Sequence, residues 1–215
     1  MLYPDNLKDN EYVALFFMKT DNKGNVIVDK NNKKVEFHKF VNSFEEYQKC
    51  IEKYRYNYHV YNALATVKAD SDGKPQRRQG NMKRQRVLFI DFDKKDYPML
   101  KDAHDFTGII KEKLPNVFLH AVYDSGHGYH YYIIIPPTCK IKEISDFNKE
   151  ISALVGADTN ACKVTQVARV PCTFNRKKPD EDGKFPLVKE IDHYQNHLRQ
   201  VANFHPLNVE NLKRT

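Results

Sequence analysis

The sequence lacks tryptophan, a Cys-x-x-Cys pair, internal repeats and any apolar run of membrane-spanning length. Its four cysteines, at positions 50, 139, 162 and 172, are scattered singly, which disfavours both a zinc site and a disulfide framework. The first residues, Met1-Leu2-Tyr3-Pro4-Asp5, show no signal-peptide pattern. We therefore expect a cytoplasmic protein with no membrane partner.

The composition is typical of a soluble globular protein with a mild preference for polyanions. With 215 residues, 40% hydrophobic and 29% charged, the chain is long enough to bury a core. The 35 basic residues exceed the 28 acidic ones and give a formal net charge of +7. The 13 tyrosines and 13 phenylalanines supply flat rings, most for the core and some able to stack on bases.

The apolar run Val87-Leu88-Phe89-Ile90 predicts a strand buried on both faces, yet it ends in Asp91-Phe92-Asp93. Because side chains alternate along a strand, Asp91 and Asp93 point to the same side, roughly 7 Å apart. Two like charges at the edge of a core repel each other and lose hydration. Mg²⁺ or Mn²⁺, which prefer oxygen ligands, would relieve both costs. The alternative is a strand that runs into a polar turn, where the aspartates cap the next element.

The first 70 residues predict a small α+β lobe in which the sequence shows no chemistry. Alternating apolar patterns predict strands over residues 12–18, 35–40 and 59–67, with a hairpin return at 26–28. The capping-box pattern Ser43-Phe44-Glu45-Glu46 predicts a helix that ends near Arg55.

A loop with many basic side chains is predicted over residues 71–86. It is either a solvated segment or a surface that binds phosphate, which guanidinium groups grip with paired hydrogen bonds. Because this loop leads directly into the strand with Asp91 and Asp93, we favour binding of nucleic acid or a triphosphate. The candidate nucleic-acid-binding residues are Arg77, Arg78, Lys83, Arg84 and Arg86.

Residues 87–192 predict the order β-α-β-β-α-β. The strands are expected over 87–93, 117–123, 129–135 and 185–191, and the helices over 98–113 and 143–155. This is the order of a split βαβ sheet, which is also called ferredoxin-like or RRM-like. In such a sheet the first and the returning strand can lie side by side, which would bring Asp91, Asp93 and His130 to one surface.

We therefore predict one α+β domain over residues 1–215. Its catalytic core, an RRM-like sheet over 87–192, follows the N-terminal lobe of 1–70 and the basic loop, and residues 193–215 form a C-terminal tail.

Three motifs stand in order along this core. They are hydrophobic-Asp-hydrophobic-Asp at 90–93, Ser-Gly-x-Gly-x-His at 125–130, and Asp158 followed by Arg-Val-Pro-Cys-Thr-Phe-Asn-Arg-Lys at 169–177. Together they resemble the catalytic domain of the archaeo-eukaryotic primase superfamily, and most closely its primase-polymerase (prim-pol) branch from plasmid, phage and mobile-element replication. The resemblance covers residues 57–192. Each motif alone is weak, whereas the ordered set is specific.

The resemblance implies a metal-dependent, template-directed nucleotidyltransferase, that is, a DNA primase, a DNA polymerase or both. Its substrates would be NTPs or dNTPs, a single-stranded DNA template and a primer strand, and a helicase or accessory primase domain is a further possible partner in cis or in trans. Two Mg²⁺ or Mn²⁺ ions would be held by Asp91, Asp93 and Asp158. His130 would complete the catalytic set and contact the phosphates of the incoming nucleotide. The other implied nucleotide-binding residues are Ser125, Gly126, Gly128, Arg169, Asn175 and Lys177.

Structural roles are open for several of these residues. His130 can be a core histidine, Asp158 can cap a short helix, and Arg169 can be an ion-pair partner. Asp192, near the end of a predicted strand, is a rival third carboxylate. At position 172 the family usually has glycine, and Cys172 there suggests either a backbone that avoids positive φ or a loop that approaches the nucleotide less closely.

Two other functions remain as alternatives. A nicking replication initiator needs paired histidines on one strand face, whereas His127 and His130 are three residues apart and straddle a turn. A non-catalytic single-strand-binding module of the RRM type presents aromatic rings on its sheet, whereas carboxylates there repel phosphate.

Overall fold

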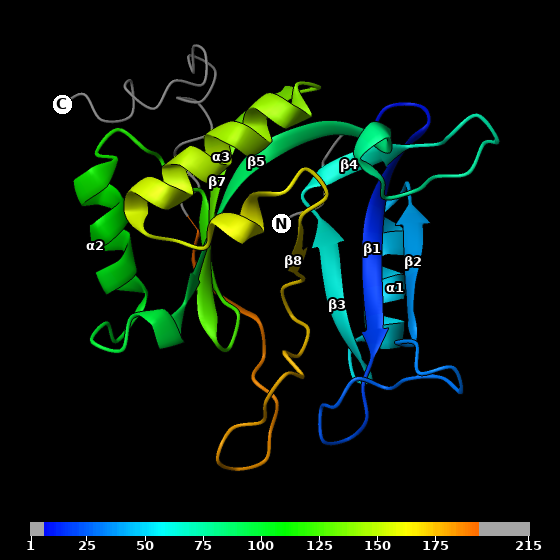
Figure 1. The fold of residues 1–215 in the computed structure, drawn as a ribbon, viewed down its shortest axis with the longest axis horizontal. Helices are drawn as coiled ribbons and strands as arrows, with labels where there is room; N and C mark the ends of the chain where they lie inside the picture. Colours follow the sequence, from blue (N-terminus) through cyan, green and yellow to red (C-terminus); the bar gives the residue numbers. More distant parts are fainter. Residues whose placement is uncertain (1–6, 194–215) are drawn as a thin grey trace. The chain divides into compact units, whose positions relative to one another are not determined.

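The computed structural model describes residues 7–193 and divides the chain into two compact units. Unit 1 contains Met1–Lys83 and Val167–Val188, and unit 2 contains Arg84–Gln166 and Lys189–Thr215. The fold is mixed α+β, with antiparallel strands and, within the described part, three α-helices (Figure 1). None of the helices in residues 7–193 is long and apolar enough to cross a membrane. Apart from His193, the tail predicted over residues 193–215 lies outside the described residues.

Unit 1 is built around β1 (Glu11–Lys19), which pairs on both edges. Its antiparallel partners are β2 (Glu36–Val41), β3 (Tyr58–Ala63) and β4 (Ala65–Lys68), and β8 (Val167–Arg169) pairs with β3. The helix α1 (Phe44–Tyr54) begins where the capping box predicts, because the Ser43 hydroxyl accepts a hydrogen bond from the Glu46 N–H. The hairpin return predicted at 26–28 is reduced to isolated bridges of Val26 and Val28.

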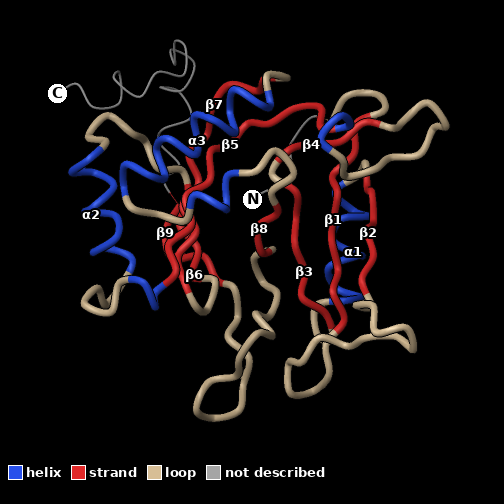
Figure 2. The backbone as a smooth tube through the Cα atoms, viewed as in Figure 1, coloured by secondary structure: helices blue, strands red, loops and turns tan. Residues whose placement is uncertain are grey.

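Unit 2 contains a sheet in the order β5-β7-β6-β9 (Figure 2). The strands are β5 (Met82–Asp93, which begins in unit 1), β6 (Ala121–Asp124), β7 (Gly128–Thr138) and β9 (Lys189–His193). The helices are α2 (Ala103–Lys113) and α3 (Ile141–Val155). As predicted, the first strand of the core lies beside the returning strand, since β5 pairs with β7.

The sequence-based topology needs two corrections. The last strand, β9, pairs with β6 at the far edge, whereas a split βαβ sheet places its last strand beside the first. Residues 167–188 were predicted as part of an uninterrupted core over 87–192, yet they belong to unit 1. The reason is pairing with a segment far away in the sequence: β8 joins β3, and the Val170 N–H donates to the Val60 carbonyl.

Several element boundaries also differ from the prediction, and three examples show why. The segment expected as a loop over 71–86 ends early, because β5 already begins at Met82. The first core helix, α2, begins at Ala103 instead of Pro98, since the Asp102 carboxylate caps it by accepting the N–H groups of His104 and Asp105. Strand β7 runs through Pro136 and Pro137 to Thr138.

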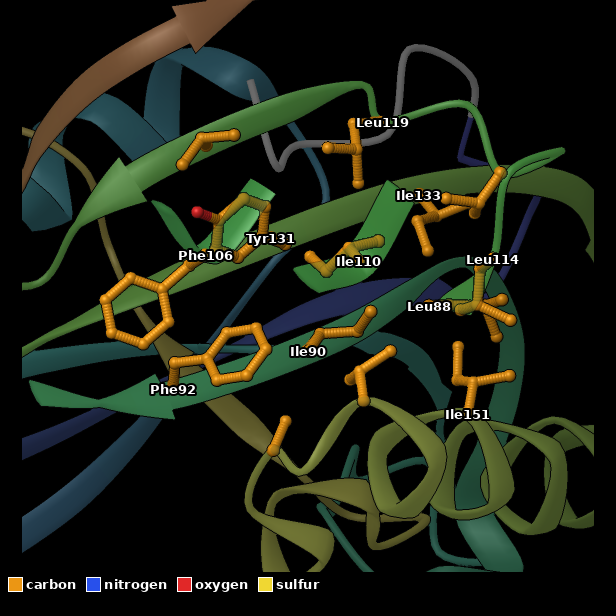
Figure 3. Close-up of a cluster of buried hydrophobic side chains, with 14 of the residues drawn as sticks. Leu88, Ile90, Phe92, Phe106, Ile110, Leu114, Leu119, Tyr131, Ile133 and Ile151 are labelled. Atoms are coloured by element: carbon orange, nitrogen blue, oxygen red, sulfur yellow. The ribbon is translucent and has the colours of Figure 1, made fainter. Parts of the chain in front are cut away.

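The core of unit 2 lies on one face of its sheet, where α2 and α3 pack (Figure 3). The even-numbered residues of β5, Leu88, Ile90 and Phe92, are fully buried in this core with Phe106 and Ile151. Because side chains alternate, the odd-numbered residues of β5 point to the opposite face. Phe89 on that face is also buried, so the prediction of a strand buried on both sides is confirmed up to the aspartates.

Candidate functional site

Asp91 and His130 lie directly opposite each other on β5 and β7. The distance from His130 Nε2 to Asp91 Oδ1 is 3.6 Å. The imidazole is buried and packs edge-on against Phe89, with ring centroids 5.0 Å apart, whereas the Asp91 side chain is 31% exposed. A strand pair therefore presents a partly solvated carboxylate beside a buried histidine, and the predicted placement of Asp91 and His130 on one surface is confirmed.

Asp158 reaches the same place from the loop after α3. Its backbone N–H donates to the Asp91 carbonyl at 2.9 Å, on the edge of β5 that faces away from β7. Gly156 ends α3 with φ of 81°, and its carbonyl accepts the Tyr97 hydroxyl. The third predicted carboxylate is thus joined to the strand of the first by a backbone hydrogen bond.

The Asp158 side chain also has the capping role that the sequence left open. Its Oδ1 accepts the Asn160 N–H at 2.8 Å and caps the short 3₁₀ helix Thr159–Cys162. The rival carboxylate, Asp192, lies on β9, which is separated from β5 by β7 and β6. That separation is roughly 14 Å at ordinary strand spacing, too far for Asp192 to share a ligand with Asp91.

The buried side chain of Asn148 on α3 fixes the same edge of β5. Its Oδ1 accepts the Phe89 N–H at 2.8 Å, and its Nδ2 donates to the Phe89 carbonyl at 2.7 Å. The amide thus continues the hydrogen-bonding pattern of the sheet where no strand does. These two bonds hold β5 at Phe89, two residues before Asp91. The Asp91 carbonyl lies on the same edge of β5 and accepts the Asp158 N–H.

Asp93 is engaged by Lys95, which immediately follows the strand. The ammonium lies 2.8 Å from Asp93 Oδ2, and the Lys95 N–H donates to Oδ1 at 3.2 Å. The hydrogen bond to Asp93 and the charges of Asp93, Asp96 and, more weakly, Asp158 raise the pKa of Lys95. The Lys95 ammonium group therefore already offsets part of the negative charge of Asp93.

A hard divalent cation suits the chemistry of this donor set. The Asp91 and Asp93 side chains are each 31% exposed, and Mg²⁺ commonly binds through one or two carboxylates plus water and substrate phosphates. Among residues 7–193, however, no three His, Cys, Asp or Glu side chains are gathered closely enough to hold a metal ion. The carboxylates that would bind it are held by local partners, Asp93 by Lys95 and Asp158 by Asn160.

The glycine-rich turn before His130 uses its donors within itself. The Ser125 N–H and hydroxyl both donate to the Gly128 carbonyl, and the Gly126 N–H donates to Asp124 Oδ1 at 2.7 Å. At Gly128 an added Cβ would lie 2.1 Å from the Phe92 carbonyl oxygen, so glycine there permits close approach to β5. The triphosphate cradle predicted for this turn stays a prediction, and these bonds fix the shape of the turn before β7.

The histidines expected of a nicking initiator do not share a strand. His127 lies in the turn, where its carbonyl accepts the Lys94 N–H, and β7 begins only at Gly128. His130 alone of the two projects from the strand beside Asp91.

The third motif is divided between the units, because Asp158 lies in unit 2 and residues 169–177 lie in unit 1. The Arg169 guanidinium stands 4.9 Å above the Tyr61 ring and its Nη1 lies 3.2 Å from His59 Nδ1. Asn175 is buried, and its Oδ1 accepts the N–H of the exposed Lys177. Asn175 therefore orients the backbone at Lys177.

The predicted basic run is divided between the two units. Arg77, Arg78 and Lys83 fall in unit 1, while Arg84 and Arg86 lie on β5 in unit 2. Of these, Arg77 has a defined place on the sheet of unit 1, where its Nε donates to His38 Nε2 at 3.0 Å.

Cys172 adopts the conformation that glycine would have at its position. Its φ is 62°, which contradicts the suggestion that a side chain there makes the backbone avoid positive φ. Its N–H donates to the Val188 carbonyl, and the Val188 N–H donates to the Thr173 carbonyl, both at 2.8 Å. This pairing holds the left-handed residue in place.

Neither a protein-family model nor a curated protein sequence matches the chain. Among solved structures, it is similar to the AEP domain of the primase-polymerase (PrimPol) of cyanophage S-2L. The TM-score is 0.58 at 10% identity, and the match covers 94% of this chain and 89% of that one. The chain has the fold of a primase-polymerase catalytic domain.

The primase RepB′ is a second structure with this fold. Its TM-score is 0.51 at 12% identity, and the match covers 84% of this chain and 51% of that one. The primase-polymerase resemblance seen in the three motifs is therefore confirmed at the level of the fold.

Sequence reasoning missed two residues that shape this candidate site, Asn148 and Lys95. Asn148 gives only a weak signal, a polar residue on the apolar face of a helix. Lys95 gives a clearer one, because a lysine two residues after an aspartate that ends a strand is within reach of that carboxylate.

Proposed function

We propose that the chain is the catalytic domain of a metal-dependent, template-directed nucleotidyltransferase that makes or extends primers. The observation that carries the proposal is the convergence of three motifs on β5: His130 opposite Asp91, and the Asp158 N–H on the Asp91 carbonyl. The primase-polymerase fold of the chain supports the same reaction class.

In this proposal Asp91, Asp93 and Asp158 would hold divalent Mg²⁺ or Mn²⁺. The ions would supply activation of the primer 3′-hydroxyl and neutralisation of the departing pyrophosphate. Binding requires that Asp93 exchange Lys95 for the cation and that Asp158 turn an oxygen toward Asp91.

His130 is the residue in this proposal that orients the triphosphate. It is held by Phe89 and its strand neighbours, so its Nε2 presents a fixed contact next to the carboxylates. The phosphate contacts that the resemblance implies for Arg169 and Lys177, both in unit 1, stay a prediction. The substrates would be NTPs or dNTPs, with single-stranded DNA as the template.

The proposal is tested by primer extension on a single-stranded template with Mg²⁺ or Mn²⁺ and labelled NTPs or dNTPs. We expect Asp91→Asn and Asp93→Asn each to lower incorporation by at least about 100-fold, since each removes a charge that the metals need. His130→Gln should raise the KM for nucleotide more than it lowers kcat.

The matched control is Asp146→Asn, which removes an exposed carboxylate paired with Lys142 on α3, away from the site. It should leave incorporation unchanged, and circular dichroism should show that all variants fold. Incorporation that persists in folded Asp91→Asn and Asp93→Asn contradicts the proposal. Omitting the primer separates strand initiation from extension, and comparing NTPs with dNTPs identifies the preferred sugar.

A further inference from the structure

The helix α1 packs on one face of the unit 1 sheet (Figure 1). A row of directly opposed residues crosses the other face of this sheet. Phe16 on β1 pairs with His38 on β2 and with Tyr61 on β3, and Tyr61 pairs with Arg169 on β8. Directly opposed residues share a face, and the neighbouring Phe17 packs into the core against α1. We call Tyr61, Phe16 and His38 the aromatic row.

The three rings of the aromatic row are stacked across their strands. The ring centroids of Tyr61 and Phe16 are 5.8 Å apart, and those of Phe16 and His38 are 5.0 Å apart, both pairs with planes 30° from parallel. All three side chains are partly exposed. The sheet therefore keeps a continuous ladder of aromatic groups at its surface.

Two arginines lie against this ladder, each held by a histidine. Arg77 stands 5.5 Å above the Phe16 ring and donates from Nε to His38 Nε2 at 3.0 Å. Arg169 stands 4.9 Å above the Tyr61 ring, with its Nη1 3.2 Å from His59 Nδ1. Each guanidinium group is thus oriented by a ring and an imidazole, and both are partly exposed.

The two histidines do not add to the positive charge at neutral pH. Burial and the nearby Arg77 lower the pKa of His38. Burial, Arg169, Arg176 and Lys177 lower the pKa of His59 to about 4. The same interactions show that Arg176 and Lys177 bring further positive charge to the Arg169 end of the row.

We propose that the aromatic row, with Arg77 and Arg169, is a binding surface for single-stranded nucleic acid. Rings and guanidinium groups are the side chains on which unpaired bases stack, and arginine also binds phosphate with paired hydrogen bonds. A duplex keeps its bases stacked on one another and cannot use the rings. The identity of the strand as a template rests on the proposed function, whereas the binding itself does not.

The test is fluorescence anisotropy of a labelled oligothymidylate with the full chain, in EDTA and without nucleotide, over a series of salt concentrations. Phe16→Leu should weaken binding about tenfold and leave the salt dependence unchanged, because it removes stacking but no charge. Arg77→Gln should weaken binding and lower the slope of log affinity against log salt by about one, because it removes one phosphate contact.

The matched controls are Tyr56→Leu and Arg55→Gln. They alter another arginine–aromatic pair of unit 1, with the Arg55 guanidinium 5.3 Å above the Tyr56 ring, outside the row. Both should bind as the unaltered chain does, and Tyr61→Leu replaces Phe16→Leu if that variant does not fold.

Unchanged affinity in the folded row variants overturns the proposal, as does an equal loss in the two controls. Competition by a blunt duplex as effective as by the single strand also overturns it. Because no metal or nucleotide is present, an inactive but normally binding chain would contradict only the proposed nucleotidyltransferase. If the chain is active but binds the oligothymidylate weakly, only the proposed single-strand-binding role of the aromatic row is contradicted.

Discussion

The ammonium group of Lys95 forms an ion pair with Asp93. The pair joins the ammonium to Oδ2 at 2.8 Å, yet the lysine side chain is 72% exposed, and exposed ion pairs are weak. In the proposed metal-bound enzyme, a divalent cation would therefore compete only with an exposed side chain that water readily replaces. The ammonium group thus weakens the repulsion between the Asp91 and Asp93 carboxylates, and it leaves both carboxylates accessible.

Replacing Lys95 should make divalent cations bind more tightly. We expect Lys95→Met to lower the Kd for Mn²⁺ about two- to fivefold, because the competing ammonium is gone. Electron paramagnetic resonance of free Mn²⁺ measures this without any reaction. The matched control is Lys142→Met, which removes an equally exposed partner of Asp146 on α3. A Kd that stays the same or rises in Lys95→Met would contradict competition.

Cys172 shows that the backbone conformation at a position cannot be inferred from the residue type alone. The absence of the usual glycine suggested a changed backbone, but φ of 62° shows that the left-handed conformation persists. A non-glycine residue pays about 1 kcal/mol or more for this conformation. The sequence identifies the strained position, and only the pairing with Val188 reveals that the strain is tolerated.

At the scale of elements, the contact between α3 and β5 sets the position of the acidic strand end. The Asn148 amide makes both a donor and an acceptor bond to Phe89, which lies among buried apolar groups. A side chain of α3 thereby makes the hydrogen bonds that a neighbouring strand would make with this edge of β5.

Removing the Asn148 amide should destabilise the protein substantially. Asn148→Ala leaves the N–H and carbonyl of Phe89 buried without these partners, and we expect the free energy of unfolding to fall by roughly 2–4 kcal/mol. Urea denaturation measures the loss. The neighbouring exposed residue provides the control, since Lys149→Ala should change stability by less than about 0.5 kcal/mol. Similar stabilities for the two variants would show that the bonds to Phe89 contribute little.

The sheet of unit 1 should lose stability in mild acid through His59. Its folded pKa of about 4 lies below the ordinary value of 6.5, so between these values the unfolded chain binds a proton that the folded chain does not. The free energy of unfolding therefore falls as the pH drops from 6.5 toward 4. We expect a contribution of about 2 kcal/mol, which is less than the full shift because solvent screens the nearby arginine and lysine charges.

This pH dependence is isolated with His59→Gln, which has no titrating group. Urea denaturation at about pH 7 and about pH 4.5 should show a smaller loss in the variant than in the unaltered chain. Carboxylates and His38 contribute equally to both and cancel in the comparison. The same loss in both proteins would exclude His59 as the source.

The residues around Asp91 illustrate what can be predicted at the level of elements. Strand alternation predicts the shared face of Asp91 and Asp93, and the order of strands predicts that His130 lies beside them. The bond between Asp158 and Asp91 is not predictable in this way, because it joins a loop to a strand edge far away in sequence. The same holds for the turn at 125–128, whose donors are used internally.

At the scale of the whole molecule, each unit is assembled from separated segments. Unit 1 takes Val167–Val188 from the far part of the chain, including Val170 in its core. The buried Arg176 donates to the Thr20 hydroxyl at 2.6 Å and to the Asp21 carbonyl at 2.8 Å. These contacts connect the third motif to the first turn of the lobe.

Unit 1 should consequently not fold from its N-terminal segment alone. We expect a fragment that ends at Lys83 to lack cooperative unfolding in urea and dispersed proton resonances, because it lacks β8 and the side chains of Val170 and Arg176. Joining Val167–Val188 to it through a Gly/Ser linker should restore both properties. Cooperative unfolding of the shorter fragment would contradict this dependence.

The sequence by itself determined the features that depend on neighbouring residues: strand alternation at Asp91 and Asp93, the Ser43 cap, and the Gly156 helix end. The tertiary structure alone decided the placement of 167–188 in unit 1, the position of β9 beside β6, and the partners of Asp158. The physical reason is that alternation and capping are set by local backbone geometry. Which edges and faces meet depends on contacts between distant segments, and those contacts leave no fixed spacing in the sequence.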